Sequence, residues 1–157
     1  MLKNRGLGTP GANEGGAEVW RWDVLKSVLI VDDEVLLART LANALRDAGW
    51  EAVTADSAEA AAVLLIPQHR YDVVVLDHRL PGESGASLLE RMRAGHDTTP
   101  AILMTAYETA SMRSRALELS VAGFFRKPFD LGEMLERLEQ IATGNDARAA
   151  TPGGRLG

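Results

Sequence analysis

Residues 73–82 read VVVLDHRLPG, and this stretch decides the fold. Three valines and a leucine form a continuous apolar run of strand length that ends in Asp77. Because the run does not alternate with polar residues, both faces of the strand are expected to be buried, as in a parallel sheet covered by helices. A carboxylate beside such a strand is costly unless something compensates its charge. Asp77 therefore either marks the exit of the strand into water or is held there for chemistry.

Four further apolar runs have the same strand-like length, and segments with helical periodicity separate them. This alternation predicts an α/β domain with a doubly wound five-stranded parallel sheet flanked by five helices. We expect it to span residues 27–143, between a flexible N-terminal extension at 1–26 and a flexible C-terminal tail at 144–157. The four further runs are residues 28–31, 52–54, 101–104 and 123–125.

Helical periodicity predicts which faces of the intervening segments are buried. The strongest pattern covers residues 131–141 and follows Asp130, a candidate N-cap with Glu133 three residues later. The weakest helical segment is 108–119, where few positions are apolar. The positions expected to face the core are Leu37, Leu41, Ala44 and Ala48 in the first helix, Ala60, Val63 and Leu64 in the second, and Leu88, Leu89 and Met92 in the third.

The N-terminal extension is rich in glycine and contains two tryptophans. Its GLGTPG stretch at residues 6–11 formally matches a dinucleotide-binding loop, but no strand precedes it, no helix follows it and Pro10 lies within it. We interpret that match as chance. Trp20 and Trp22 are expected to pack on the adjacent domain, with a partner surface as the alternative.

Composition excludes several classes of function. The chain has 157 residues, 46% of them hydrophobic, which is enough for one domain with a proper core. It has no cysteine, which excludes disulfides and thiolate metal sites. Its net charge of −5 argues against direct nucleic-acid binding. No apolar run approaches the roughly 20 residues of a membrane span, so we expect a cytoplasmic protein without membrane contact.

Polar residues follow the strand-like runs at the points where four of them end. The first run ends in Asp32 and Asp33, the third in Asp77, the fourth in Thr105 and the fifth shortly before Lys127. A parallel sheet brings these ends to one edge, which is where ligands bind in doubly wound folds. Clustered carboxylates need a cation, and their hard oxygens suit Mg²⁺. The plainer interpretation, helix capping, is expected to hold for Glu34 and Asp56, and Ser57 beside Asp56 also offers an N-cap.

Lys127 is distinguished by composition. It is the only lysine between residues 27 and 143, where the other basic residues are arginines. A compact ammonium at this position suits a phosphoryl group, since phosphoryl transfer requires charge neutralisation and positioning. Asp77 beside Mg²⁺ can act as the nucleophile and form an aspartyl phosphate.

The motifs VLIVDDE, VVVLDHRLPGESG, ILMTAY and FFRKPF together resemble the signature segments of response-regulator receiver domains. The resemblance covers about residues 27–143. It implies a flavodoxin-like fold with strand order 2-1-3-4-5 and a Mg²⁺-dependent phosphoacceptor. The phosphoryl donor would be a histidine kinase or a histidine phosphotransfer protein.

The resemblance also implies roles for individual residues. Asp77 would be the phosphoacceptor, and Phe124 would be the switch aromatic that couples to Thr105. The Lys127-Pro128 bond would be cis. The metal would be held by Asp32, Asp33, Asp77 and the backbone carbonyl of Arg79, and the phosphoryl group would be contacted by Thr105 and Lys127.

This chain departs from the family pattern at a few positions. Ser120 and Val121 replace the usual Gly-Ala after the fourth helix, and Phe124 replaces a frequent tyrosine. Arg79 and Tyr107 occupy positions that tune dephosphorylation, and we expect them to shield the site from water. A downstream protein is expected to bind the face of the fourth helix, fifth strand and fifth helix, a face that also allows a phosphorylation-dependent homodimer.

Other readings of the same residues remain open. A phosphatase with an aspartate nucleophile would need a second aspartate two positions after Asp77, where this chain has Arg79. A flavin-nucleotide binder would need a phosphate loop in place of Asp32-Asp33-Glu34. Within the receiver class, we expect a stand-alone receiver rather than an enzyme with turnover. The alternative is the excised receiver of a larger DNA-binding regulator.

Overall fold

The computed structural model describes residues 10–12, 18–20, 25–66 and 71–144. Within the two longer ranges, five strands alternate with five helices, which confirms the predicted α/β class. The strands are β3 (Ser27–Val31), β4 (Glu51–Ala55), β5 (Val73–Asp77), β6 (Ala101–Thr105) and β7 (Gly123–Arg126). The helices are α1 (Val35–Asp47), α2 (Ala58–Leu64), α3 (Gly85–Ala94), α4 (Ala110–Glu118) and α5 (Leu131–Ala142).

The five strands form one parallel sheet in the order β4-β3-β5-β6-β7. Counted from β3, this is the predicted order 2-1-3-4-5. Strand β5 lies at the centre and pairs with β3 on one side and β6 on the other. Its four apolar residues are completely buried, as the unbroken apolar run indicated. The VVVL stretch therefore delivers Asp77 to a fixed point at the middle of the sheet edge.

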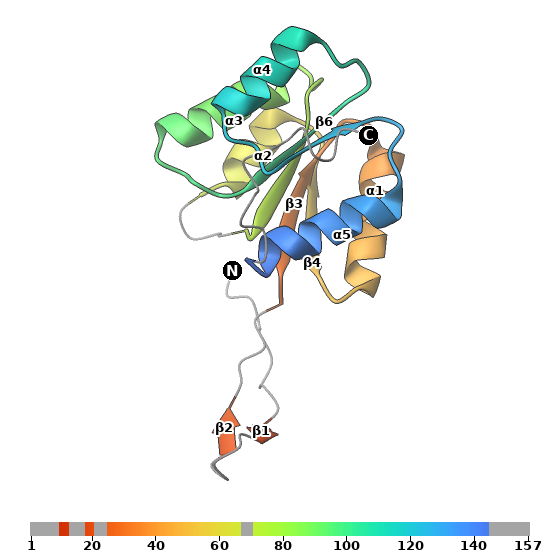
Figure 1. Ribbon diagram of the computed structural model, residues 1–157, viewed down its shortest axis with the longest axis vertical. Coiled ribbons are helices and arrows are strands. Elements are labelled where there is room, and N and C mark those ends of the chain that lie inside the picture. Colours follow the sequence, from red (N-terminus) through yellow and green to blue (C-terminus); the bar gives the residue numbers. More distant parts are fainter. Residues whose placement is uncertain (1–9, 13–17, 21–24, 67–70, 145–157) are drawn as a thin grey trace.

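Two helical layers cover the sheet (Figure 1). Helices α1 and α5 pack on one face, and α2, α3 and α4 pack on the other. Successive residues of each strand alternate between the two cores, so that Leu29 lies in one core and Ile30 in the other. Both faces of the sheet are dry, and the polar ends of the strands are left at its edges.

The buried faces of the first two helices differ from the predicted ones. Helix α1 buries Ala38, Leu41, Ala42 and Leu45, whereas Leu37 and Ala44 are half-buried and Ala48 is exposed beyond the last helical turn. In α2 the buried residues are Ala58 and Ala61. Of the predicted positions, Ala60 and Leu64 are partly buried against the core, whereas Val63 is 71% exposed. Apolar residues occur on several sides of both helices, so periodicity did not fix which side faces the sheet. The prediction for α3 is confirmed, since Leu88, Leu89 and Met92 are buried.

Four helices begin with a side chain that accepts a backbone N–H bond. Asp130 accepts from the amide of Glu133, as predicted for α5. At α2 the cap is Ser57, so the expectation that Asp56 caps this helix is wrong. Ser84 and Thr109 cap α3 and α4 in the same way. These caps fix where each helix starts after its strand.

The amino-terminal end of β3 is tied to α5 by a small polar network. Glu139 of α5 accepts a hydrogen bond of 2.7 Å from the indole Nε1 of Trp50 and pairs with the ammonium of Lys26. The same ammonium lies 5.8 Å from the centre of the Trp50 ring. The network links the start of two strands to the last turns of α5.

The N-terminal extension contains two short strands that the sequence analysis did not predict. β1 (Pro10–Ala12) pairs antiparallel with β2 (Glu18–Trp20). The expected packing of Trp20 and Trp22 on the domain lies outside what the structure describes, which includes Trp20 only as backbone. Among the described residues, no helix has the length and apolar character needed to span a bilayer.

Candidate functional site

The carboxyl ends of the parallel strands bring the predicted site residues to one edge of the sheet. Residues Asp32 and Asp33 follow β3, Asp77 ends β5, Thr105 ends β6, and Lys127 follows β7. The strand register aligns these ends, because Val31 pairs with Leu76 and Asp77 pairs with Met104. Four strands that are neighbours in the sheet thus contribute to one small area.

Three carboxylates form the acidic part of the site. Each of Asp32, Asp33 and Asp77 offers one oxygen, and these oxygens lie within 4.8 Å of one another. Asp32 and Asp77 are buried, while Asp33 is exposed. A set of carboxylate oxygens at this spacing fits a hard divalent cation such as Mg²⁺, which takes one or two carboxylates and keeps several waters.

Lys127 is the cation that neutralises this cluster in the protein itself. Its Nζ lies 2.7 Å from Oδ2 of Asp32, 2.9 Å from Oε1 of Glu34 and 3.4 Å from Oδ2 of Asp77. Burial opposes the charge on the ammonium, but the hydrogen bonds to Asp32 and Glu34 outweigh it and raise the pKa of Lys127. The backbone holds the residue in place, since the Lys127 amide donates to the carbonyl of Thr105 at 2.7 Å.

Asp77 is the carboxylate whose ionisation is least favourable. Burial raises the pKa of its carboxyl to about 6, and the neighbouring charge of Asp32 adds to the rise. Lys127 and the backbone amide of Arg79 act in the opposite direction by bonding the charged form. A buried carboxylate with a raised pKa beside a fixed ammonium is typical of a functional site rather than of a strand that merely ends in water.

Thr105 and its neighbours form the other side of the site. The Thr105 hydroxyl is buried, donates to the carbonyl of Tyr107 at 2.9 Å and accepts from the Tyr107 amide at 3.1 Å. The guanidinium of Arg79 lies 5.6 Å from the centre of the Tyr107 ring. Phe124 is buried in the core on the α2–α4 side of the sheet. The Lys127-Pro128 bond is cis, as the family resemblance implied.

The sequence and the strand order of this chain have counterparts among known proteins. A family model described as the response regulator receiver domain matches residues 28–139 of this chain. The chain belongs to this family.

Two relatives of this receiver domain are named as transcriptional regulatory proteins. The probable transcriptional regulatory protein TcrX of Mycobacterium tuberculosis is 33% identical over 130 residues, which cover 83% of this chain and 55% of TcrX. The phosphate regulon transcriptional regulatory protein PhoB of Pseudomonas aeruginosa is 32% identical over 118 residues, which cover 74% of this chain and 51% of PhoB. The chain spans about half the length of these relatives.

Solved structures of receiver domains resemble the fold closely. The non-phosphorylated HemR receiver domain from Leptospira biflexa is 35% identical with a TM-score of 0.70, and the match covers 75% of this chain and 94% of that receiver-domain chain. A response regulator receiver protein from Pseudomonas putida is 31% identical with a TM-score of 0.71, covering 74% and 98%. The family resemblance proposed from the motifs is thereby confirmed.

The structure of the receiver domain also brings in Glu34, which sequence reasoning assigned to helix capping. Glu34 occupies the N-cap position of α1, but its side chain makes no capping hydrogen bond. The carboxylate instead pairs with Lys127, so the capping expectation is wrong. The signal was present in the sequence, because Glu34 directly follows the Asp32-Asp33 pair at the same strand end.

Gly85, the first residue of α3, was also missed as a determinant of the site. A Cβ added there would lie 2.1 Å from the backbone carbonyl oxygen of Asp77. The Gly85 amide donates to the carbonyl of His78 at 2.9 Å, which fixes this close approach. Only glycine lets α3 start against the strand end that carries Asp77. The residue lies in the quoted motif VVVLDHRLPGESG, but its backbone contact could not be derived from spacing.

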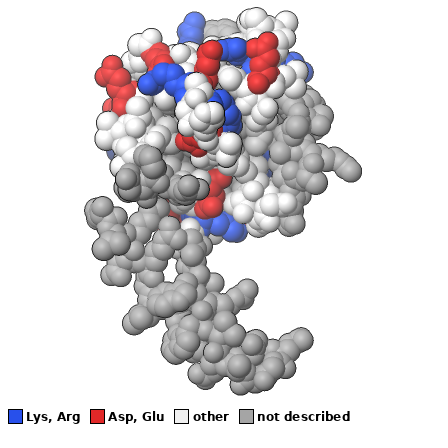
Figure 2. All heavy atoms as spheres, turned by 90° about the vertical axis from the view of Figure 1, so that its left-hand side faces the viewer, with Lys and Arg blue, Asp and Glu red and all other residues white. Residues whose placement is uncertain are grey.

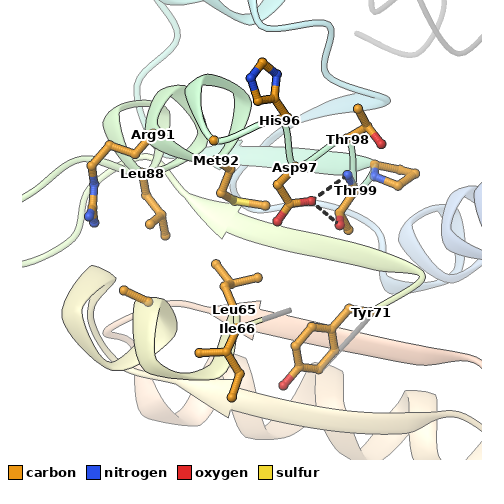
Figure 3. Close-up of a pocket in the computed structure, with 13 residues that line it drawn as sticks. Leu65, Ile66, Tyr71, Leu88, Arg91, Met92, His96, Asp97, Thr98 and Thr99 are labelled. Carbon is orange, nitrogen blue, oxygen red and sulfur yellow. Dashed lines mark hydrogen bonds between the residues drawn. The ribbon is translucent and has the colours of Figure 1, made fainter. Parts of the chain in front are cut away.

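A cavity lined by described residues lies away from this edge (Figure 3). It has a volume of about 640 Å³ and lies between the end of α2 and the end of α3. Tyr71 and Pro100, which line it, precede β5 and β6 and therefore lie at the opposite edge of the sheet from Asp77. Asp97 accepts two hydrogen bonds from Thr99 across its wall. The cavity contributes nothing to the acidic site.

Charges on the visible outer face of the receiver domain are mixed rather than of one sign. Figure 2 shows basic and acidic side chains interspersed on the face that lies to the left in Figure 1. Ion pairs join such residues on α3 and α4, among them Arg91 with Glu83 and Arg115 with Glu90. On this visible face the described basic side chains do not gather into one continuous patch.

Proposed function

We propose that this chain is a phosphoacceptor receiver domain of a two-component signalling system, phosphorylated on Asp77. The observation that carries the proposal is the position of Asp77, which is buried at the centre of the sheet edge with Lys127 at 3.4 Å and two further carboxylates beside it. The phosphoryl donor would be a histidine kinase or a histidine phosphotransfer protein. A cytoplasmic location is part of the proposal and accords with the absence of cysteine.

In the proposed reaction an Asp77 carboxylate oxygen attacks the phosphorus of the donor. The new bond joins that oxygen to phosphorus, and the bond from phosphorus to the donor breaks, so that the leaving group keeps the electron pair. With a phosphohistidine donor the leaving group is the imidazole nitrogen, which takes up a proton. Lys127 would contact an equatorial phosphoryl oxygen, and Thr105 would donate its hydroxyl to another.

The residues of the acidic cluster fit a resident Mg²⁺. Asp33 and Asp77 would bind the ion directly, together with the backbone carbonyl of Arg79. Asp32 would bind waters that the ion keeps. When bound, the ion supplies charge neutralisation for the phosphoryl oxygens. The donor set contains oxygen ligands only, which is the set that Mg²⁺ prefers.

Thr105 and Phe124 are proposed to carry the switch. Thr105 now bonds the backbone of Tyr107, and engaging a phosphoryl group would release that bond and the segment leading into α4. Phe124 lies on β7, next to β6, where Thr105 ends the strand. A downstream protein, or a second phosphorylated copy of the chain, would then bind the face of α4, β7 and α5.

Acetyl phosphate tests the proposal directly. The protein is incubated with acetyl phosphate and Mg²⁺, and intact mass is measured. We expect one phosphoryl adduct on the wild type, none on Asp77→Asn, and an unchanged adduct on Asp47→Asn, which changes an exposed aspartate at the end of α1. An equal adduct on Asp77→Asn would assign the phosphoryl group to another residue and overturn the proposal.

Two settings for such a receiver are supported by different observations. The mixed surface charge supports the stand-alone receiver, which acts by binding a protein. The curated relatives are transcriptional regulators of about twice the matched length, which supports the receiver of a larger DNA-binding regulator. An enzyme that hydrolyses phosphate esters is disfavoured in both settings, because Arg79 stands where an aspartate general acid would be needed.

A further inference from the structure

Lys127 shares its ammonium among three carboxylates. Its Nζ lies within 3.4 Å of carboxylate oxygens of Asp32, Glu34 and Asp77. The contacts to Asp32 and Glu34 are hydrogen bonds, and the contact to Asp77 is a longer ion pair. An ammonium has three N–H donors and no acceptor, so a phosphoryl oxygen that binds Lys127 closely competes with these acids for its donors.

The three contacts are unequal. Asp32 makes the shortest, at 2.7 Å, and its side chain is completely buried. Glu34 follows at 2.9 Å with a side chain that is 62% exposed, and Asp77 is the most distant at 3.4 Å. The ammonium is thus held toward the two acids that follow β3 and away from the strand end that carries Asp77.

Glu34 is oriented for this contact by its own backbone. Its amide donates to Oδ1 of Asp32 at 2.9 Å, which fixes the turn between β3 and α1. Its side chain makes no capping bond to α1 and is turned toward Lys127 instead. A glutamate at an N-cap position that forgoes capping points to a different role for its carboxylate.

We propose that Glu34 is a positioning residue that holds the Lys127 ammonium back from Asp77 and competes with the phosphoryl group for it. The inference rests on the proposed function, since it concerns phosphoryl transfer to Asp77. During transfer one Lys127 N–H exchanges its hydrogen-bond acceptor, from the Glu34 carboxylate to a phosphoryl oxygen. Water then hydrates the released carboxylate. Because the Glu34 side chain is mostly exposed, breaking its contact with Lys127 costs little free energy. Glu34 therefore moderates the rate of transfer and does not decide whether transfer occurs.

The test compares Glu34→Gln with a matched control, Asp56→Asn. Asp56 is an exposed acid that follows β4 at the same edge of the sheet, so its loss changes the net charge equally without a contact to Lys127. Phosphorylation by acetyl phosphate is followed at saturating Mg²⁺ over a range of donor concentrations. We expect Glu34→Gln to raise the rate constant at saturating donor about two- to fivefold, the range for one exposed ion pair, while the half-saturating donor concentration changes no more than in Asp56→Asn.

A second measurement follows the ammonium itself, in protein without metal or donor. The chain has only three lysines, Lys3, Lys26 and Lys127, so side-chain ¹H–¹⁵N spectra are simple and Lys127→Arg assigns the signal. Glu34→Gln should shift the Lys127 signal and speed its exchange with water, and leave that of Lys26 unchanged. An unmoved Lys127 signal, or a rate constant equal to that of Asp56→Asn, would overturn the inference. Failure of the wild type itself to take up phosphoryl on Asp77 would instead overturn the proposed function.

Discussion

The guanidinium of Arg79 lies over the ring of Tyr107, 5.6 Å from its centre. Arg79 follows the strand that ends in Asp77, and Tyr107 follows the strand that ends in Thr105, so the contact joins the two segments that leave these strand ends. We expect this pair to shield a phosphoryl group on Asp77 from water.

We expect Arg79→Ala to shorten the lifetime of the phosphorylated protein. Loss of an exposed cation–π contact of about 0.5–1 kcal/mol removes this shield, which corresponds to a roughly two- to fivefold faster hydrolysis. Decay of the phosphoryl adduct is measured by intact mass after the donor is removed. Arg39→Ala, which removes an exposed arginine on α1, serves as the control. Equal lifetimes in wild type and Arg79→Ala would refute the shielding role.

Asp77→Asn should stabilise the metal-free protein, and the gain should depend on pH. The pKa of Asp77 is raised from its ordinary 3.8 to about 6, so the protonated carboxyl stabilises the fold below pH 4, and this contribution is lost as pH rises through 6. The difference corresponds to about 3 kcal/mol at full ionisation. Asparagine does not ionise, so its advantage in urea unfolding should be small at pH 4 and large at pH 7.5.

Mg²⁺ supplies the control for that experiment. Binding to the folded wild type raises its free energy of unfolding with metal concentration. Asp77→Asn lacks one of the carboxylates, so the metal should narrow the gap between the two proteins at pH 7.5. A stability difference independent of pH would show that the burial of Asp77 has no energetic cost.

Gly85→Ala should destabilise the fold strongly and displace the start of α3. The new Cβ would meet the Asp77 carbonyl oxygen at 2.1 Å. Neither atom can rotate away, because the oxygen belongs to the backbone and the backbone fixes the position of the Cβ. Overpacking of this kind costs about 1–3 kcal/mol, or more. Gly95→Ala at the end of the same helix is the matched control, because its nearest neighbour would be 3.5 Å away and its φ is −85°. Similar unfolding free energies for the two variants would contradict the close-contact argument.

Ser120→Gly should stabilise the protein by up to about 1 kcal/mol. Ser120 follows α4 with a φ of 54°, a left-handed conformation that glycine adopts without strain and other residues do not. It is the position where the family usually has glycine. Ser114→Gly, within α4 and exposed, should lower stability by about 0.5 kcal/mol, since glycine weakens a helix interior. Thermal unfolding of both variants checks the opposite signs.

Much of the fold could be predicted because the strands are unambiguous. Unbroken runs such as Val73–Leu76 require burial on both faces, and that requirement alone leads to a parallel sheet with helices on both sides. The side of a helix that faces the sheet was harder to predict. In α1 apolar residues lie on several sides, and tertiary packing selected Ala38 and Leu45 over Ala48.

The candidate site divides in the same way. Asp32, Asp33, Asp77 and Lys127 could be brought together from sequence because each ends a strand, and parallel strands end at one edge. The individual contacts within the site could not be predicted from sequence, because they depend on the direction of side chains and on how closely backbone segments approach. The pairing of Glu34 with Lys127 and the contact of Gly85 with the Asp77 carbonyl required coordinates.

The hydrogen bond between Trp50 and Glu139 makes Trp50 an intrinsic fluorescence probe of the domain. An indole that is 3% exposed and bonded to a carboxylate on α5 emits at a wavelength that depends on that helix staying in place. With Trp20 and Trp22 replaced by phenylalanine, Trp50 would be the sole tryptophan of the chain. A shift of its emission on addition of acetyl phosphate would then report a change at the contact between Trp50 and α5 without any attached dye.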